Sequence, residues 1–167
     1  MTTEMSSKYR EEGYYLMDLG IRDEVEELHD EFRQVFDTVS RVNGGPAVNT
    51  DADIVSLYHS EYRDLWVAAY DQLGQLLGVY TLVTKPIVKQ IMDICGLGML
   101  AYTSKIATRV DMPLGEGSTP TPAHQDYPSH QGSGNSVTLW IPLQDVDSED
   151  GALQAFPASH LDGVIPK

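Results

Sequence analysis

The chain has 167 residues and a hydrophobic fraction of 41%, enough to build the core of a single domain over residues 1–167. Its 25 acidic and 11 basic residues give a formal net charge of −14, which disfavours nucleic acid and anionic membranes as partners. The N-terminus lacks the apolar stretch of a signal peptide, and no apolar run approaches the ~20 residues of a membrane span. With one cysteine, Cys95, no internal disulfide can form, so we expect a cytoplasmic protein.

Helical patterns dominate the first part of the chain. Residues 8–17 predict a helical turn, a break at Gly13 and then a strand. From Asp23 onward, apolar residues recur at spacings of three and four, which predicts an amphipathic helix ending before Asn43-Gly44-Gly45-Pro46. We expect Asp23 to cap the first turn of this helix.

The next stretch predicts two more helices. Residues 47–60 are ambiguous and favour a loop with about one helical turn. Helical spacing returns over residues 61–77. A further helix over residues 84–95 is expected to carry Pro86 in its first turn and to stop at Gly96.

After Gly98 the hydrophobic period changes from helical to two. Residues 99–112, 123–127 and 152–156 predict short strands. The clearest strand covers residues 136–146, where four apolar residues alternate with Thr138 and Trp140: Val137, Leu139, Ile141 and Leu143. A tight turn is expected from Asp147 to Gly151. Helices followed by strands indicate the α+β class.

His124 and Asp126 lie two residues apart in an extended stretch, so their side chains are expected on the same face. An imidazole and a carboxylate placed in this way can supply two of the three ligands of a 2-His-1-carboxylate iron site. Such a triplet is common by chance, so its meaning depends on the residues that follow it.

Those residues form an ordered set. After His124-Gln-Asp126 come Val137-Thr-Leu-Trp-Ile-Pro-Leu143, the acidic turn from Asp145 to Gly151, and Phe156-Pro-Ala-Ser-His160. Together with the opening Tyr9-Arg-Glu-Glu-Gly-Tyr14, this set resembles the phytanoyl-CoA dioxygenase family of iron- and 2-oxoglutarate-dependent oxygenases. The resemblance covers most of the chain and is strongest from residue 108 to residue 160.

The resemblance implies a mainly β core, a double-stranded β-helix (a cupin-like jelly roll), with the N-terminal helices packed on one sheet. It implies Fe(II) bound by His124 and Asp126, with 2-oxoglutarate and O2 as co-substrates. The implied reaction oxidises 2-oxoglutarate to succinate and carbon dioxide and hydroxylates an unactivated C–H bond of a small organic molecule.

Three residues are implied near the co-substrate: Gln125, Trp140 and Arg109. Alternatively, Trp140 is an aromatic residue of the core. Arg109 is alternatively a surface residue or part of a salt bridge. Tyr102 and Tyr127 could line a substrate cavity, although half-buried sheet residues are the simpler interpretation.

The other histidines are expected outside the metal site. The family's motif gives His160 a structural role at a strand end, and His130, His29 and His59 are expected to be solvated. Cys95 is expected to be a buried small hydrophobe.

The family's third ligand, a downstream His, and the Arg that binds the distal carboxylate of 2-oxoglutarate have no counterpart in this sequence. We therefore expect the C-terminal strands of the barrel to be missing. The favoured explanation is a further C-terminal portion. The others are a degenerate relative that has lost activity, or a neighbouring chain that completes the barrel in a homodimer.

Two other functions were weighed against an oxygenase. A non-catalytic jelly-roll binding or scaffold protein with a degenerate iron site is the main alternative. A cupin-type isomerase or metal-dependent lyase is disfavoured, because the usual His-x-His pair is absent.

Overall fold

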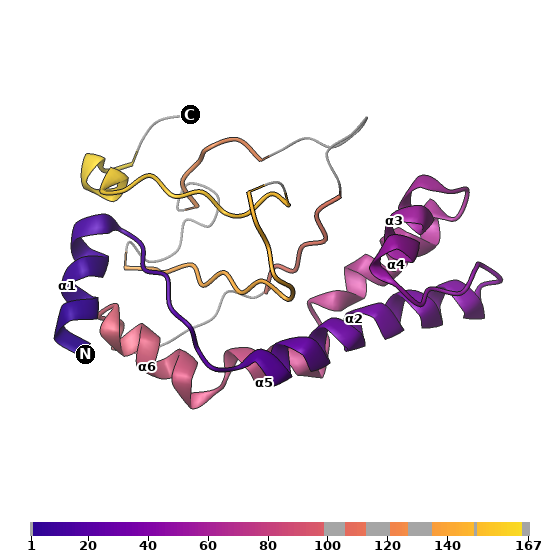
Figure 1. Ribbon diagram of the computed structural model, residues 1–167, viewed down its shortest axis with the longest axis horizontal. Helices are drawn as coiled ribbons and strands as arrows, with labels where there is room; N and C mark the ends of the chain where they lie inside the picture. Colours follow the sequence, from indigo (N-terminus) through magenta and orange to yellow (C-terminus); the bar gives the residue numbers. More distant parts are fainter. Residues whose placement is uncertain (1, 99–105, 113–120, 127–134, 149, 165–167) are drawn as a thin grey trace.

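The computed structural model describes residues 2–98, 106–112, 121–126, 135–148 and 150–164. Six α-helices and one 3-10 helix are found in these ranges: α1 (Thr2–Glu12), α2 (Arg22–Val42), α3 (Asp51–His59), α4 (Arg63–Leu73), α5 (Leu77–Val83), α6 (Pro86–Ile94) and η1 (Ser159–Asp162). Helices α6, α5 and α2 follow one another along one side of the molecule, and the described segments after α6 lie on its other side (Figure 1).

The amphipathic helix predicted from Asp23 is confirmed as α2. Its buried face is formed by Leu28, Phe32 and Phe36, at the spacing of three to four residues read from the sequence. The predicted cap is wrong, because α2 begins at Arg22 and Ile21 occupies the N-cap position without a side-chain bond. Asp23 instead lies in the first turn, where its charge faces the positive end of the helix dipole.

The loop predicted for residues 47–60 is wrong over most of its length, because α3 forms there. Thr50 and Asp53 make a capping box: Thr50 Oγ1 accepts from the Asp53 amide at 3.2 Å, and Asp53 Oδ2 accepts from the Thr50 amide at 2.9 Å. Only Ile54 and Leu57 of this helix are buried, so the sequence carries little helical periodicity.

The helix predicted over residues 61–77 is divided, because α4 ends at Leu73 and α5 begins at Leu77. Gly74 follows α4 directly, and a Cβ at this position would lie 2.7 Å from the Ile106 carbonyl oxygen. The close approach of the later chain therefore requires glycine there. The last predicted helix is confirmed as α6, with Pro86 as its first residue.

The main core lies between α2, α3, α4 and α5. The Trp66 ring stacks on the Tyr70 ring with their centroids 4.9 Å apart. Its centroid lies 5.7 Å from that of the Phe36 ring. The buried side chains of this cluster are Leu28, Phe32, Phe36, Val48, Ile54, Leu57, Trp66, Ala69, Leu73, Val79 and Leu82. A second, smaller cluster is formed on α6 by Val88, Ile91 and Met92.

Two extended segments, residues 106–112 and 137–143, pack against these helices with alternating burial. Ile141 and Leu143 contact the main core, whereas Val137 and Leu139 contact the α6 cluster. The apolar side chains on one face of segment 137–143 therefore contact both clusters. This burial agrees with the predicted period of two.

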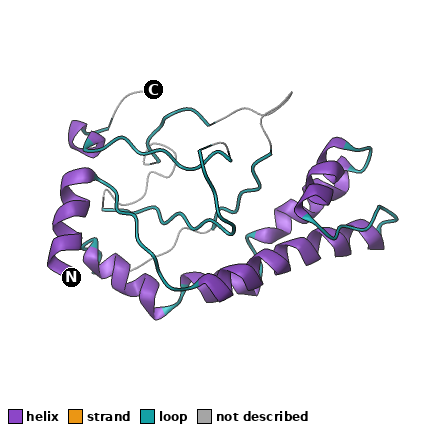
Figure 2. Cartoon of the chain, in the orientation of Figure 1, coloured by secondary structure: helices purple, strands orange, loops and turns teal. Residues whose placement is uncertain are grey.

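Within the described ranges no β-ladder is formed, and Figure 2 shows these segments as loops. The jelly roll therefore stays a prediction. The turn predicted from Asp147 to Gly151 is confirmed by the bond from the Ala152 amide to the Asp147 carbonyl at 3.1 Å and by a Gly151 φ of +84°.

The end of the described chain returns to the C-terminal end of α1. The Ala158 amide donates to the Glu12 carbonyl at 2.8 Å, and His160 Nε2 donates to the Arg10 carbonyl at 2.9 Å. Gly13, at φ +80°, lies under the His160 ring, because a Cβ there would be 2.3 Å from Nδ1. Residues 158–160 thus bind the last turn of α1.

We predict that Gly13→Ala lowers the free energy of unfolding by more than Gly44→Ala does. Both glycines have the same left-handed conformation, with φ values of +80° and +79°, which costs an alanine about 1–2 kcal/mol. Only Gly13 also has a ring in the space of the new methyl group. Urea denaturation of the two variants measures the difference.

The His160→Ala background provides the control, because it removes the ring. In that background Gly13→Ala should cost no more than Gly44→Ala. Equal effects of the two glycine substitutions in the wild-type chain would contradict the packing of His160 on Gly13.

Candidate metal centre

His124 lies on an irregular segment, residues 121–126, and a contact with the backbone orients its ring. His124 Nδ1 is 2.8 Å from the Pro122 carbonyl oxygen. Because a carbonyl oxygen can only accept, Nδ1 is the nitrogen that carries the proton. Nε2 of the neutral ring is then left with a free lone pair.

That lone pair faces a carboxylate. His124 Nε2 lies 3.3 Å from Asp126 Oδ1, as the predicted common face of the two side chains requires. Two acceptor atoms this close repel each other unless a proton or a metal ion stands between them. The exposed fractions of the two side chains, 41% and 46%, leave the pair open to solvent.

The donor set fits a divalent transition metal such as Fe(II). Neutral imidazole and carboxylate are its usual protein ligands, and two adjacent ligand atoms with bonds of about 2.1 Å are roughly 3 Å apart. A metal-binding histidine commonly donates its other ring N–H to a carbonyl, as His124 does to Pro122.

Asp126 has a second contact that the sequence reading did not single out. Thr138 Oγ1 donates to Asp126 Oδ2 at 2.6 Å. The sequence signal was the alternation of residues 137–143, which assigns Thr138 and Trp140 to the face opposite Val137 and Leu139. The bond to Asp126 identifies that face as the one nearest the His124–Asp126 pair.

Trp140 shares this outward face and is 44% exposed. The structure therefore does not place its ring in either core cluster, which was the alternative to a role beside the co-substrate. Gln125, between the two candidate ligands, points elsewhere: its Nε2 donates to the Gly163 carbonyl at 2.9 Å. This bond ties segment 121–126 to the chain after η1.

Arg109 is exposed and forms an ion pair with Asp111, two residues further along the same face. The same segment is attached to α4 through the Tyr70 hydroxyl, which donates to the Thr108 carbonyl at 2.9 Å. Burial raises the pKa of Tyr70, and the nearby charge of Arg109 acts in the opposite direction. Arg109 is thus held near α4 in the salt-bridged state.

Among the described residues, no group of three His, Cys, Asp or Glu side chains is arranged to hold a metal ion. His29 Nε2 lies 3.2 Å from Asp51 Oδ1 on the far helices, and His160 is bonded to α1. His130, Tyr102 and Tyr127 fall outside the described residues. Burial raises the pKa of the half-buried Cys95 thiol, which agrees with its expected role as a small hydrophobe.

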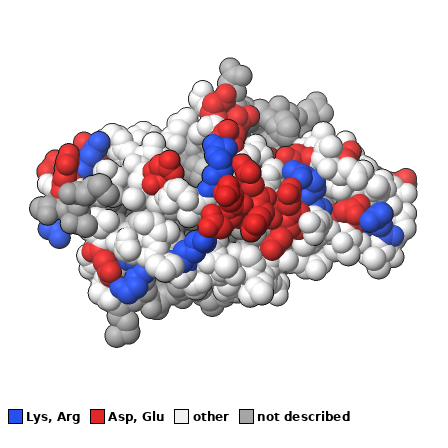
Figure 3. All heavy atoms as spheres, turned by 60° about the horizontal axis from the view of Figure 1, so that its bottom comes forward, with Lys and Arg blue, Asp and Glu red and all other residues white. Residues whose placement is uncertain are grey.

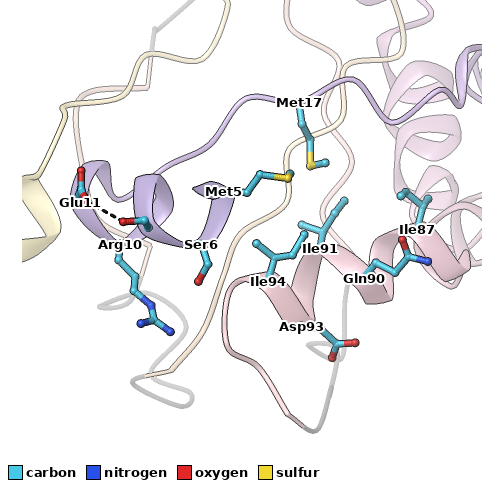
Figure 4. Close-up of a pocket in the computed structure, with 11 residues that line it drawn as sticks. Met5, Ser6, Arg10, Glu11, Met17, Ile87, Gln90, Ile91, Asp93 and Ile94 are labelled. Carbon is cyan, nitrogen blue, oxygen red and sulfur yellow. Dashed lines mark hydrogen bonds between the residues drawn. The ribbon is translucent and has the colours of Figure 1, made fainter. Parts of the chain in front are cut away.

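A groove with a volume of about 880 Å³ lies elsewhere, between α1 and α6. Figure 4 shows Met5, Met17, Ile91 and Ile94 converging in it, with a Ser7–Glu11 hydrogen bond on its α1 side. None of the expected metal or co-substrate residues lines this groove. It is therefore separate from the candidate centre.

The His–Asp pair and its surroundings are of the kind found in proteins that bind one metal ion through imidazole and carboxylate. The family model for phytanoyl-CoA dioxygenase (PhyH) matches residues 9–167, and the chain belongs to this family. The family uses Fe(II) and 2-oxoglutarate in oxygenase chemistry. No curated protein and no solved structure matches the chain. In the described ranges, no helix is sufficiently long and apolar to cross a membrane.

We predict that His160→Ala destabilises the protein without changing its metal affinity. The substitution removes the bond to the Arg10 carbonyl, which is worth about 1 kcal/mol. Urea denaturation and Fe(II) titration of the same preparation measure the two quantities. Loss of metal binding at unchanged stability would instead make His160 a ligand.

Proposed function

We propose that this protein is an Fe(II)- and 2-oxoglutarate-dependent oxygenase that hydroxylates an unactivated C–H bond of a small organic molecule. The observation that carries the proposal is the 3.3 Å approach of His124 Nε2 to Asp126 Oδ1, with the other ring nitrogen bound to the Pro122 carbonyl. The family match over residues 9–167 supports the same chemistry.

In this proposal His124 and Asp126 hold the iron, which supplies the O2 chemistry that no amino-acid side chain provides. His124 contributes a neutral nitrogen whose orientation is set by Pro122. Asp126 contributes negative charge, which partly balances the charge of the metal. Both side chains are half-exposed, so a co-substrate can reach the centre from the solvent side.

Trp140 and Arg109 are proposed to contact 2-oxoglutarate. The Trp140 ring is on the same face as Thr138, the residue that bonds to Asp126, and can cover the centre with an apolar surface. Arg109 can bind a carboxylate only after leaving its pair with Asp111. Gln125 contributes by fixing segment 121–126 through Gly163.

The charge of the protein bears on the substrate class. The net charge is −14, and Figure 3 shows a cluster of acidic side chains near the middle of the face drawn, with further acidic side chains elsewhere on it. Such a field disfavours substrates with several phosphate groups. We therefore propose a substrate that is neutral, cationic or carries a single carboxylate.

A second candidate function is a non-catalytic binding protein that keeps the fold with an incomplete iron site. The absence of a three-ligand group among the residues that the structure describes favours it. The two candidates differ in one measurable property, which is turnover of 2-oxoglutarate by the iron-loaded protein.

We predict that His124→Ala abolishes Fe(II) binding and leaves the fold intact. Removing one of two ligands leaves Asp126 as the remaining candidate ligand, and a single half-exposed carboxylate binds a divalent cation poorly. Anaerobic titration with Fe(II) measures the affinity, and circular dichroism measures the fold. His59→Ala is the matched control, because His59 is exposed at the end of α3 and far from the site in sequence. Unchanged affinity in His124→Ala would remove His124 from the site.

We further predict that protein loaded with Fe(II) under anaerobic conditions converts 2-oxoglutarate to succinate when O2 is admitted. Asp126→Asn should reduce this conversion to the background of free iron, because the amide lacks the negative charge that balances the metal. Mass spectrometry of succinate measures the product. Iron binding that depends on His124 without any succinate would support the non-catalytic alternative.

A further inference from the structure

We infer that Thr138 is a positioning residue that makes Asp126 a ligand through one oxygen only. The inference rests on the proposed function, because it concerns how Asp126 would meet the metal. Its basis is that the two oxygens of the Asp126 carboxylate have different neighbours. Thr138 Oγ1 lies 2.6 Å from Oδ2, and His124 Nε2 lies 3.3 Å from Oδ1.

The hydrogen bond itself is of a strong kind. An O–H group donating to a carboxylate at 2.6 Å lies within the range of charge-assisted hydrogen bonds. Thr138 therefore holds Oδ2 on the side of segment 137–143. Rotation of the Asp126 carboxylate about its Cβ–Cγ bond would break this contact, so the bond also keeps Oδ1 directed toward His124.

The position of the Thr138 hydroxyl is set by its neighbours along the chain. Val137 and Leu139, on either side, pack against the α6 cluster. Since consecutive side chains of an extended segment point to opposite faces, this packing directs Thr138 away from the helices. The helical layer thus determines the place of the donor, and the donor determines the orientation of Asp126.

The chemical consequence concerns coordination number. A carboxylate can bind a metal through one oxygen or through both, and binding through both occupies one more position. An iron site of this class needs open positions for its co-substrate and O2. By retaining Oδ2, Thr138 preserves one of them and supplies the kind of outer contact that metal-bound carboxylates usually have.

The test compares Thr138→Val with Thr138→Ser. Valine has nearly the same shape without the donor, and serine keeps the donor with a smaller side chain. Titration of each protein with Co(II), followed by its visible absorption, reports affinity and coordination without any turnover. We expect Thr138→Val to bind Co(II) about 10–100-fold more weakly with an altered spectrum, and Thr138→Ser to retain most of the wild-type affinity.

A second measurement does not depend on the metal. Without metal, Thr138→Val should lower the midpoint of urea denaturation in the wild-type chain and leave it unchanged in Asp126→Ala, because the lost partner is the same. This cycle also shows whether each variant is folded. Thr138→Ala serves as a second donor-free variant for the same comparison.

The outcomes separate the two levels of the proposal. Wild-type Co(II) binding that is insensitive to both His124→Ala and Asp126→Ala would overturn the proposed function. Binding that depends on those ligands but is equal in wild-type and Thr138→Val would overturn the role of Thr138 alone. Equal weakening in the valine and serine variants would also overturn it, since the hydroxyl group would then not be the cause.

Discussion

The alternation of side chains along residues 137–143 is the constraint on which the candidate centre depends. Four alternate side chains pack against the two helical clusters: Val137, Leu139, Ile141 and Leu143. Thr138 therefore points to the opposite face of the segment. That face is where Asp126 is bonded. A shift of this segment by one residue would turn the Thr138 hydroxyl toward the apolar side chains of the helices. It would also expose to solvent the four apolar side chains that now pack there. The packing of the helices thus sets the chemistry on the other side of the chain.

When the His124 ring is neutral, the pair formed by His124 and Asp126 brings two acceptor atoms within 3.3 Å of each other. The Pro122 carbonyl oxygen binds Nδ1, so Nε2 is the ring nitrogen that faces the Asp126 carboxylate. A proton on Nε2, or a metal ion between Nε2 and Oδ1, would turn this contact into an attractive one.

Sequence patterns predicted those features that repeat along the chain. The apolar face of α2, the Pro86 start of α6 and the period of two after Gly98 were all readable, because each involves several residues. The α3 helix was missed because it buries only Ile54 and Leu57 and depends on a local capping box. The His124–Asp126 pair could be predicted from its i, i+2 spacing. The Thr138 contact could not, since it joins two segments whose relative position is decided by packing on the helices.

The attachment of residues 158–160 to α1 joins parts of the chain that are 150 positions apart at the bond between His160 and Arg10. A contact of such sequence separation carries a loop-closure cost that contacts within a helix do not have. Until residues 158–160 are in place, the Arg10 and Glu12 carbonyls of α1 lack these partners, whereas α2, α3, α4 and α5 share a core to which α1 contributes no residue.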